Sequence, residues 1–192
     1  LNNGFCPKYN LWFPRMNLSN INTKSYLSFI KKCKSQKGET LISSLNKLEI
    51  KLKEQELKGK KYNIILDGAN IGYYKQRPDL GGKLNYEQIE FVKVEITKYI
   101  GTYLKNTDTE ISCLIILHQR HFHPKSIMIQ KWEKENCIFK SPYHENDDYF
   151  WLYASLYYPN TYIITNDEMR DHIFSSFSKP EFIEWKNRHT IN

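Results

Sequence analysis

Four aspartates stand at three places in this 192-residue sequence where they could act together. Asp67 ends a short apolar run, Asp147 and Asp148 open an aromatic-rich segment, and Asp167 follows another apolar run. Asp171 comes four residues after Asp167, so one helix face would carry both. Carboxylates that lie close together repel each other unless cations offset their charge, and Mg²⁺ prefers oxygen ligands of this kind. Two such ions can support hydrolysis of a phosphodiester bond, which is the chemistry that this set predicts.

Each aspartate also has an ordinary structural explanation. Asp147, or Asn146 before it, could cap a helix, and Asp167 could cap another. Asp67 precedes a glycine and could serve a turn. We favour a shared metal site because all of these residues are expected on one rim of one sheet.

That rim follows from the elements that the hydrophobic pattern predicts. Short apolar runs bounded by polar residues indicate buried strands, and longer stretches with apolar residues every three or four positions indicate helices. Strands that alternate with helices favour an α/β fold with a parallel sheet flanked by helices, in which ligands bind beyond the carboxyl ends of the strands. We expect strands over 62–66, 111–117, 137–139 and 161–165, and helices over 24–34, 40–58, 85–104, 124–135, 146–158 and 168–177.

The charge of the chain is unevenly distributed. Residues 1–61 hold 13 Lys or Arg and 4 Asp or Glu, a balance of +9, whereas residues 62–192 hold 15 and 17, a balance of −2. A basic lobe beside a slightly acidic one indicates an anionic partner, and nucleic acid fits. A+T-rich coding is an alternative origin of the many lysines. No apolar run is long enough to span a membrane, and four widely spaced cysteines do not indicate a disulfide framework.

Several stretches resemble the signatures of the protein-only ribonuclease P family, in the same order and spacing. They are LDGANIG at 66–72, NDDYFWLYA at 146–154 and TNDEMRDHIF at 165–174, with LHQRH at 117–121 similar to the family's basic loop and WKNRH at 185–189 to its C-terminal motif. The resemblance covers residues 62–192 best. It implies a PIN-like NYN metallonuclease domain that removes the 5′ leader of precursor tRNA.

The resemblance also implies roles for individual residues. Asp67, Asp147, Asp148 and Asp167 would be catalytic and would bind two Mg²⁺ ions, for which Mn²⁺ could substitute, and Asp171 would be an outer ligand. RNA would contact His118, Arg120, His121 and Arg170. The alternatives are a merely polar loop over 118–123, a metal site of its histidines, and pairing of Arg170 with aspartates of its own helix. The aromatic residues 149–151 are expected to pack rather than to stack on bases.

A structural zinc ion is implied less completely. Cys6 and His189 match two of the family's ligands, but Tyr9 stands where a second cysteine is expected, and a final cysteine would lie beyond Asn192. A structural zinc site has four ligands. The alternative is a lobe that packing alone holds together.

At the level of the chain, we expect a basic lobe over residues 1–60, the nuclease domain over 61–178, and a tail over 179–192 that returns to the lobe. The resemblance implies a monomer without an RNA subunit or a membrane, and a pentatricopeptide-repeat domain upstream in the full-length protein. The compartment would be a mitochondrion, a plastid or the nucleus. The alternative functions are a less selective NYN endoribonuclease and an inactive RNA-binding PIN-like module.

Overall fold

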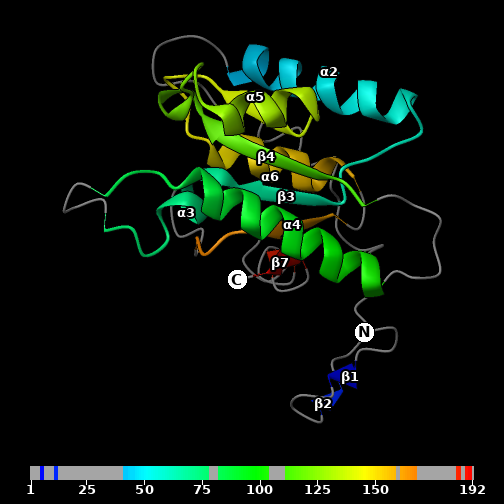
Figure 1. Ribbon diagram of the computed structural model, residues 1–192. Coiled ribbons are helices and arrows are strands. Elements are labelled where there is room, and N and C mark those ends of the chain that lie inside the picture. Colours follow the sequence, from blue (N-terminus) through cyan, green and yellow to red (C-terminus); the bar gives the residue numbers. More distant parts are fainter. Residues whose placement is uncertain are drawn as a thin grey trace.

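The computed structural model describes residues 5–6, 11–12, 41–77, 82–103, 111–158, 161–167, 185–186 and 189–191. Within these ranges the main sheet has five strands, all parallel, in the spatial order β5-β4-β3-β6-β7 (Figure 1). The strands are β3 (Ile64–Asp67), β4 (Cys113–His118), β5 (Ile138–Ser141), β6 (Tyr162–Ile164) and β7 (Thr190–Ile191). A separate antiparallel pair joins β1 (Phe5–Cys6) to β2 (Leu11–Trp12).

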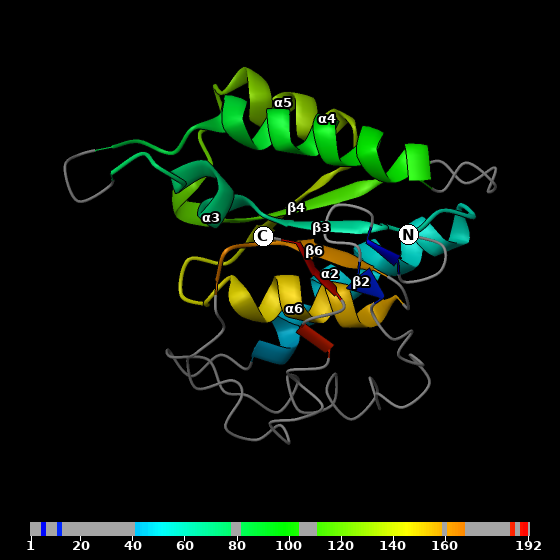
Figure 2. The same ribbon diagram turned by 90° about the horizontal axis from the view of Figure 1, so that it is seen from below.

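Helices cover both faces of the sheet (Figure 2). One face carries α3 (Gly68–Tyr73), α4 (Tyr86–Tyr103) and α5 (Ile127–Lys134), and the other carries α2 (Leu41–Leu57) and α6 (Asp148–Tyr157). Every residue of β3 and β4 is buried, as expected of parallel strands covered on both sides. Along β3, Ile64 and Leu66 join one core cluster and Ile65 joins the other, because successive side chains point to opposite faces. The expected α/β class is confirmed.

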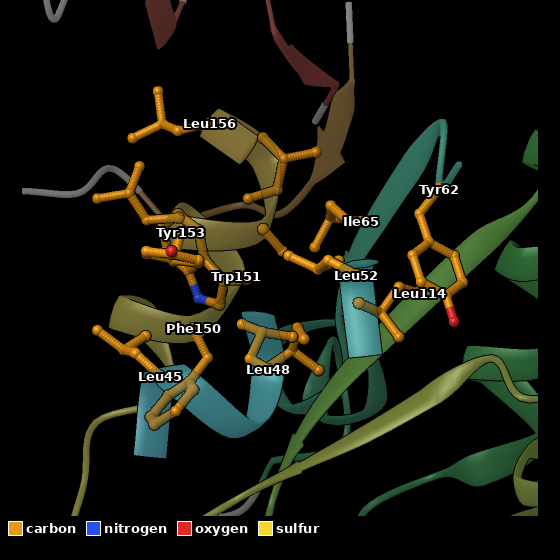
Figure 3. Close-up of a cluster of buried hydrophobic side chains, with 14 of the residues drawn as sticks. Leu45, Leu48, Leu52, Tyr62, Ile65, Leu114, Phe150, Trp151, Tyr153 and Leu156 are labelled. Carbon is orange, nitrogen blue, oxygen red and sulfur yellow. The ribbon is translucent and has the colours of Figure 1, made fainter. Parts of the chain in front are cut away.

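The core between α2, α6 and the sheet follows from leucine spacing. Leu41, Leu45, Leu48 and Leu52 recur on one helix face, and all four are fully buried in one core cluster with residues of α6 and the strands. Figure 3 shows Leu45, Leu48 and Leu52 in this cluster. Polar contacts fix the same packing, since the Tyr158 hydroxyl donates to the Leu52 carbonyl at 2.6 Å. Trp185, near the chain end, belongs to the same buried cluster. The helix α2 therefore shares one buried core with α6 and the main sheet.

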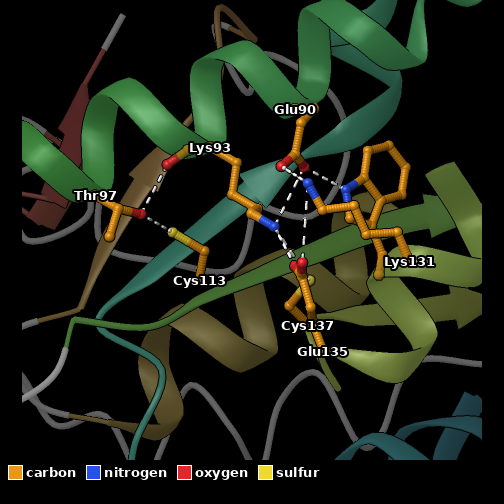
Figure 4. A network of polar contacts seen from close by, with 8 residues as sticks. Glu90, Lys93, Thr97, Cys113, Lys131, Glu135 and Cys137 are labelled. Atoms are coloured by element: carbon orange, nitrogen blue, oxygen red, sulfur yellow. Dashed lines mark hydrogen bonds and ion pairs between the residues drawn. The ribbon is translucent and has the colours of Figure 1, made fainter.

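A charged network joins α4 to α5 on the other face (Figure 4). Glu90 accepts hydrogen bonds from Lys131 and from the Trp132 indole, both at 2.6 Å, and Lys93 pairs with Glu90 at 3.2 Å and with Glu135 at 2.5 Å. Burial by itself raises the pKa of Glu90, but these partners outweigh it and hold the pKa below its ordinary value. The network sets how α4 lies against α5.

Most of the expected elements are confirmed where the structure describes them. The helices expected over 40–58, 85–104, 124–135 and 146–158 correspond to α2, α4, α5 and α6, and the four expected strands are present. The short helix α3 and the strands β1, β2 and β7 are not among the expected elements. The helices expected over 24–34 and 168–177 fall outside the described residues. Among the helices described, none has the length and apolar character to cross a membrane.

Candidate functional site

The topology places a binding crevice between β3 and β6. From β3 the chain builds β4 and β5 on one side, and α6 then carries it back to β6 on the other side of β3. Open α/β sheets bind ligands beyond the strand ends at such a reversal. Two hydrogen bonds cross this point. Thr165 Oγ1 donates to Asp67 Oδ2 at 2.8 Å, and the Asn166 N–H donates to Asn70 Oδ1 at 2.9 Å.

A hollow of about 530 Å³ opens at this crevice. It is lined by Asp67, Asp147, Asp148 and Asp167, together with Ala69, Asn70, Tyr73, Tyr74 and Asn166. The structure thus brings together the four aspartates that sequence reasoning selected from separate stretches of chain. Asp171 lies outside the described residues. We call this hollow, with its four aspartates, the carboxylate hollow.

Asp67 is the most buried of the four, with 4% of its surface exposed. It is the N-cap of α3, because its Oδ1 accepts from the Asn70 N–H at 3.1 Å, while Oδ2 accepts from Thr165. Burial, followed by the charge of Asp147, raises the pKa of Asp67 to about 7. Asp67 therefore both caps α3 and lines the carboxylate hollow. A cation nearby would favour the charged form of its carboxyl group.

Asp147 differs from an ordinary helix cap. It occupies the N-cap position of α6, yet its side chain makes no capping hydrogen bond, and its buried Oδ2 has no hydrogen-bond partner. Burial raises the pKa of Asp147, while the charges of His118 and Arg120 oppose the rise. A buried carboxylate oxygen without a partner is costly unless something binds it.

Asp148 is held firmly by its neighbours. Asn146 Nδ2 donates to its Oδ2 at 2.8 Å, and the Trp151 indole donates to its Oδ1 at 3.2 Å. Burial, followed by the charge of Asp147, raises the pKa of Asp148 to about 6. Asn146 Oδ1 also accepts from the Asp148 N–H at 3.2 Å, so Asn146 makes the contact with the start of α6 that was considered as an alternative role, while Asp147 does not. Phe150 and Trp151 are buried and pack, as expected.

Three supporting residues were not selected from the sequence. Thr165 links two aspartates, since its hydroxyl donates to Asp67 and accepts the Asp167 N–H at 3.0 Å. Asn70 and Asn146 hold the chain around Asp67 and Asp148. The signal that could have found them is their position, one to three residues from an aspartate at a predicted strand or helix end.

The basic loop lies on the same rim. Its Arg120 donates from the backbone N–H to His118 Nδ1 at 3.2 Å and from Nε to His121 Nε2 at 2.9 Å, so both histidines accept from arginine. Burial lowers the pKa of His118 and brings that of His121 to about 4, the latter helped by the charge of Arg120. Arg120 itself is exposed and brings the positive charge of its guanidinium to the loop. Arg170 lies outside the described residues.

The oxygen ligands of the carboxylate hollow suit a hard divalent cation. The four carboxylates and the unpaired Asp147 Oδ2 form the kind of ligand set that Mg²⁺ or Mn²⁺ takes. In the part of the chain that the structure describes, no three His, Cys, Asp or Glu side chains already surround one point as metal ligands. The fit therefore rests on the chemistry of the hollow rather than on a completed coordination shell.

The expected zinc ligands are described only in part. His189 is buried, its ring stacks on Trp185, and its Nδ1 lies 2.7 Å from the Thr161 carbonyl oxygen. Because a carbonyl oxygen accepts, Nδ1 carries the proton and Nε2 carries the lone pair, the tautomer common in metal-binding histidines. The side chain of Cys6 is outside the described residues, and the zinc site stays a prediction.

The fold and the site together define an α/β domain with a carboxylate hollow at the topological switch of a parallel sheet. Comparison with known proteins gives the family. The model of the family "Protein-only RNase P" matches residues 30–192, and the chain belongs to that family.

Several proteins of Arabidopsis thaliana are similar to this chain. The chain is 35% identical over 136 residues to proteinaceous RNase P 3 and 34% identical over 138 residues to proteinaceous RNase P 2. Each alignment covers 68% of this chain but 22% and 24% of those relatives. The crystal structure of nuclear proteinaceous RNase P 2 matches 98% of this chain, and 37% of that chain, with 26% identity and a TM-score of 0.68. The chain thus spans about a quarter of its relatives' length.

Proposed function

We propose that this chain is the catalytic part of a protein-only ribonuclease P, which removes the 5′ leader of precursor tRNA by hydrolysing one phosphodiester bond. The observation that carries the proposal is the carboxylate hollow in a chain of this family, with a buried Asp147 oxygen that lacks a hydrogen-bond partner. The products are a tRNA with a 5′ phosphate and a leader with a 3′ hydroxyl.

The metal ligands in this proposal are Asp67, Asp147, Asp148 and Asp167, with Asp171 as an outer ligand. Two Mg²⁺ ions bound there, or Mn²⁺ in their place, would supply a hydroxide nucleophile and stabilise the leaving oxygen. Thr165 and Asn70 orient Asp67, while Asn146 and Trp151 orient Asp148. This second set of contacts keeps the carboxylates in place before any ion binds.

The basic loop would hold the RNA. Arg120 is exposed and close enough to the hollow for its charge to act on Asp147. Such a guanidinium suits a phosphate next to the one that is cut. His118 and His121 position Arg120, because each accepts one of its hydrogen bonds. Arg170 is a further candidate contact from the sequence.

At the level of the whole protein, the proposed enzyme works without an RNA subunit and without a membrane. It is a monomer, and its full-length chain carries a pentatricopeptide-repeat domain upstream that binds the tRNA. A structural zinc ion bound by Cys6 and His189 belongs to the same proposal. The compartment is a mitochondrion, a plastid or the nucleus.

The test is the position of cleavage on a precursor tRNA, with Mg²⁺ and with EDTA. We expect one cut at the leader junction that EDTA abolishes. Asp148→Asn keeps the size of the side chain, so it should still bind RNA while cleavage falls by about a hundredfold or more. Glu133→Gln, which changes an exposed carboxylate on α5, is the matched control and should cut normally.

Other outcomes would point elsewhere. Normal cleavage by Asp148→Asn would contradict the assignment of the site. Equal cutting of an unstructured RNA of the same length would favour a less selective endoribonuclease. RNA binding without any cutting by the unaltered chain, at high protein and Mg²⁺ concentration, would favour an inactive RNA-binding module.

A further inference from the structure

A second hollow, of about 370 Å³, lies beside the carboxylate hollow. It is lined by His118, Arg120, Tyr143, His144, Glu145 and Asn146, and we call it the loop hollow. It arises because β4 and β5 end together. His118 pairs with Ser141 as the last register position, so the segments 119–121 and 142–147 leave the sheet side by side. Sequence reasoning had assigned no role to Tyr143 or His144.

Two groups connect the loop hollow to the carboxylates. Asn146 forms part of its wall and donates to Asp148 Oδ2 at 2.8 Å. Arg120 forms another part, and its charge acts on Asp147. The loop hollow thus borders the carboxylate hollow, where a nucleotide next to a phosphate bound at the carboxylates would lie.

The chemistry of the walls suits a nucleobase. Tyr143 has 61% of its surface exposed, and its ring lies 5.9 Å from His118 and 5.1 Å from His144, centre to centre. Proteins bind unpaired bases on aromatic rings of this kind and on arginine planes. Glu145 lines the same hollow, so the lining includes an acidic residue and is not that of a purely cationic phosphate site.

We infer that the loop hollow binds one unpaired nucleotide next to the scissile phosphate, with its base against Tyr143 and its phosphate against Arg120. The inference rests on the proposed function, because it places the nucleotide relative to a bond cut at the carboxylate hollow. It adds a base-binding subsite to the metal site. A volume of this order is within the range of pockets that hold small ligands.

The test combines Tyr143→Ala with precursor tRNAs that carry one abasic ribose at each nucleotide flanking the cut. On the intact substrate, kcat/KM should fall roughly tenfold, the usual effect of losing one base–aromatic stack. The loss should disappear on one abasic substrate, because the base that Tyr143 contacts is then already missing. Tyr143→Phe keeps the ring and should behave as the unaltered chain does.

Tyr162→Ala is the matched control. Tyr162 is 37% exposed and opens β6, so it lies at the opposite end of the strands from the site. It should change neither cleavage nor RNA affinity. A Tyr143→Ala chain that cuts as well as the unaltered one would overturn the inference, as would an equal loss on every abasic substrate.

A second measurement separates the two proposals. If the unaltered chain leaves precursor tRNA uncut with Mg²⁺, the proposed function fails, and the subsite is judged by affinity for a short single-stranded RNA. Tyr143→Ala must then weaken binding several-fold, and this effect must be smaller for an oligonucleotide with abasic positions. Unchanged affinity would overturn the subsite as well.

Discussion

At the scale of single residues, the site is built from carboxylates whose burial opposes their charge. Asp67 and Asp148 have pKa values raised to about 7 and about 6, and burial is the first cause in both. Hydrogen bonds from Asn70, Thr165, Asn146 and Trp151 lower these values only in part. The side chains are thus held in place at some cost in stability, which a bound cation would offset.

This cost predicts how stability depends on pH. Because the pKa of Asp67 is higher in the folded chain than its ordinary value, the folded state binds more protons between about pH 4 and 7. The free energy of unfolding in EDTA should therefore fall as pH rises through that range, by on the order of 2–4 kcal/mol. In Asp67→Asn that part of the slope should be absent, as measured by chemical denaturation at a series of pH values.

Magnesium provides the control for this prediction. Ligands must be deprotonated to bind a metal, so added Mg²⁺ should raise the melting temperature more at about pH 8 than at about pH 5.5. The increase should be much smaller in Asp67→Asn. Identical pH slopes for the two chains would show that Asp67 is not the strained carboxylate that its burial indicates.

At the scale of elements, the junction between β3 and α3 sets the position of Asp67. The helix begins at Gly68, directly after the aspartate that caps it. A Cβ atom at Gly68 would lie 2.8 Å from the Ile116 carbonyl oxygen and 3.0 Å from Ile115 Cγ2 on β4. The missing side chain thus allows α3 to approach the neighbouring strand, and this close approach holds the edge of the carboxylate hollow.

Substitution of that glycine should therefore affect both stability and activity. Gly68→Ala should lower the free energy of unfolding by about 1–3 kcal/mol, because α3 must move away from β4. Cleavage should fall as well, since Asp67 moves with the helix that it caps. Denaturant titration and the precursor tRNA assay measure the two effects.

Gly101 provides the comparison. It lies in α4, and a Cβ atom there would be 3.9 Å from its nearest neighbour, Ile111. Gly101→Ala should stabilise the chain by about 0.5–1 kcal/mol, because alanine favours a helix over glycine. If Gly68→Ala were as stable as Gly101→Ala, the close packing of α3 on β4 would not be required.

At the scale of the whole molecule, residues 1–61 carry a charge balance of +9, whereas the four aspartates of the carboxylate hollow belong to residues 62–192, whose balance is −2. Lys58, Lys60 and Lys61 are exposed at the end of that basic stretch. The lysines of this stretch either bind RNA phosphates or reflect A+T-rich coding. Lysines that contact phosphates release counterions from the RNA when it binds, whereas lysines of the second kind do not.

The two explanations predict different salt dependences of RNA binding. If the basic stretch binds phosphates, replacing Lys58 and Lys61 by Gln should reduce the slope of log affinity against log salt by roughly one for each lysine that had bound a phosphate. Lys98, on α4, has an exposed side chain outside the basic stretch, so Lys98→Gln should leave the slope unchanged. Fluorescence anisotropy with precursor tRNA at several salt concentrations measures it. An unchanged slope in the double variant would favour coding composition.

The sequence by itself determined the elements with a clear pattern and the residues at their ends. Leucine spacing predicts α2, because a buried helix face places apolar residues every three or four positions. Apolar runs predict β3 and β4, because a strand buried on both sides is apolar at every position. The rule for carboxyl ends of parallel strands then places Asp67 and Asp167 on one rim. The family motifs identify the same aspartates.

Only the tertiary structure decided what depends on distant segments meeting. The two residues of β7 are too few to carry a pattern, and they form a strand because β6 offers an edge to pair with. The link from Thr165 to Asp67 exists because the chain reverses around β3. The loop hollow exists because β4 and β5 end in register, which brings Tyr143 beside Arg120 although neither position has a local sequence signal for the other.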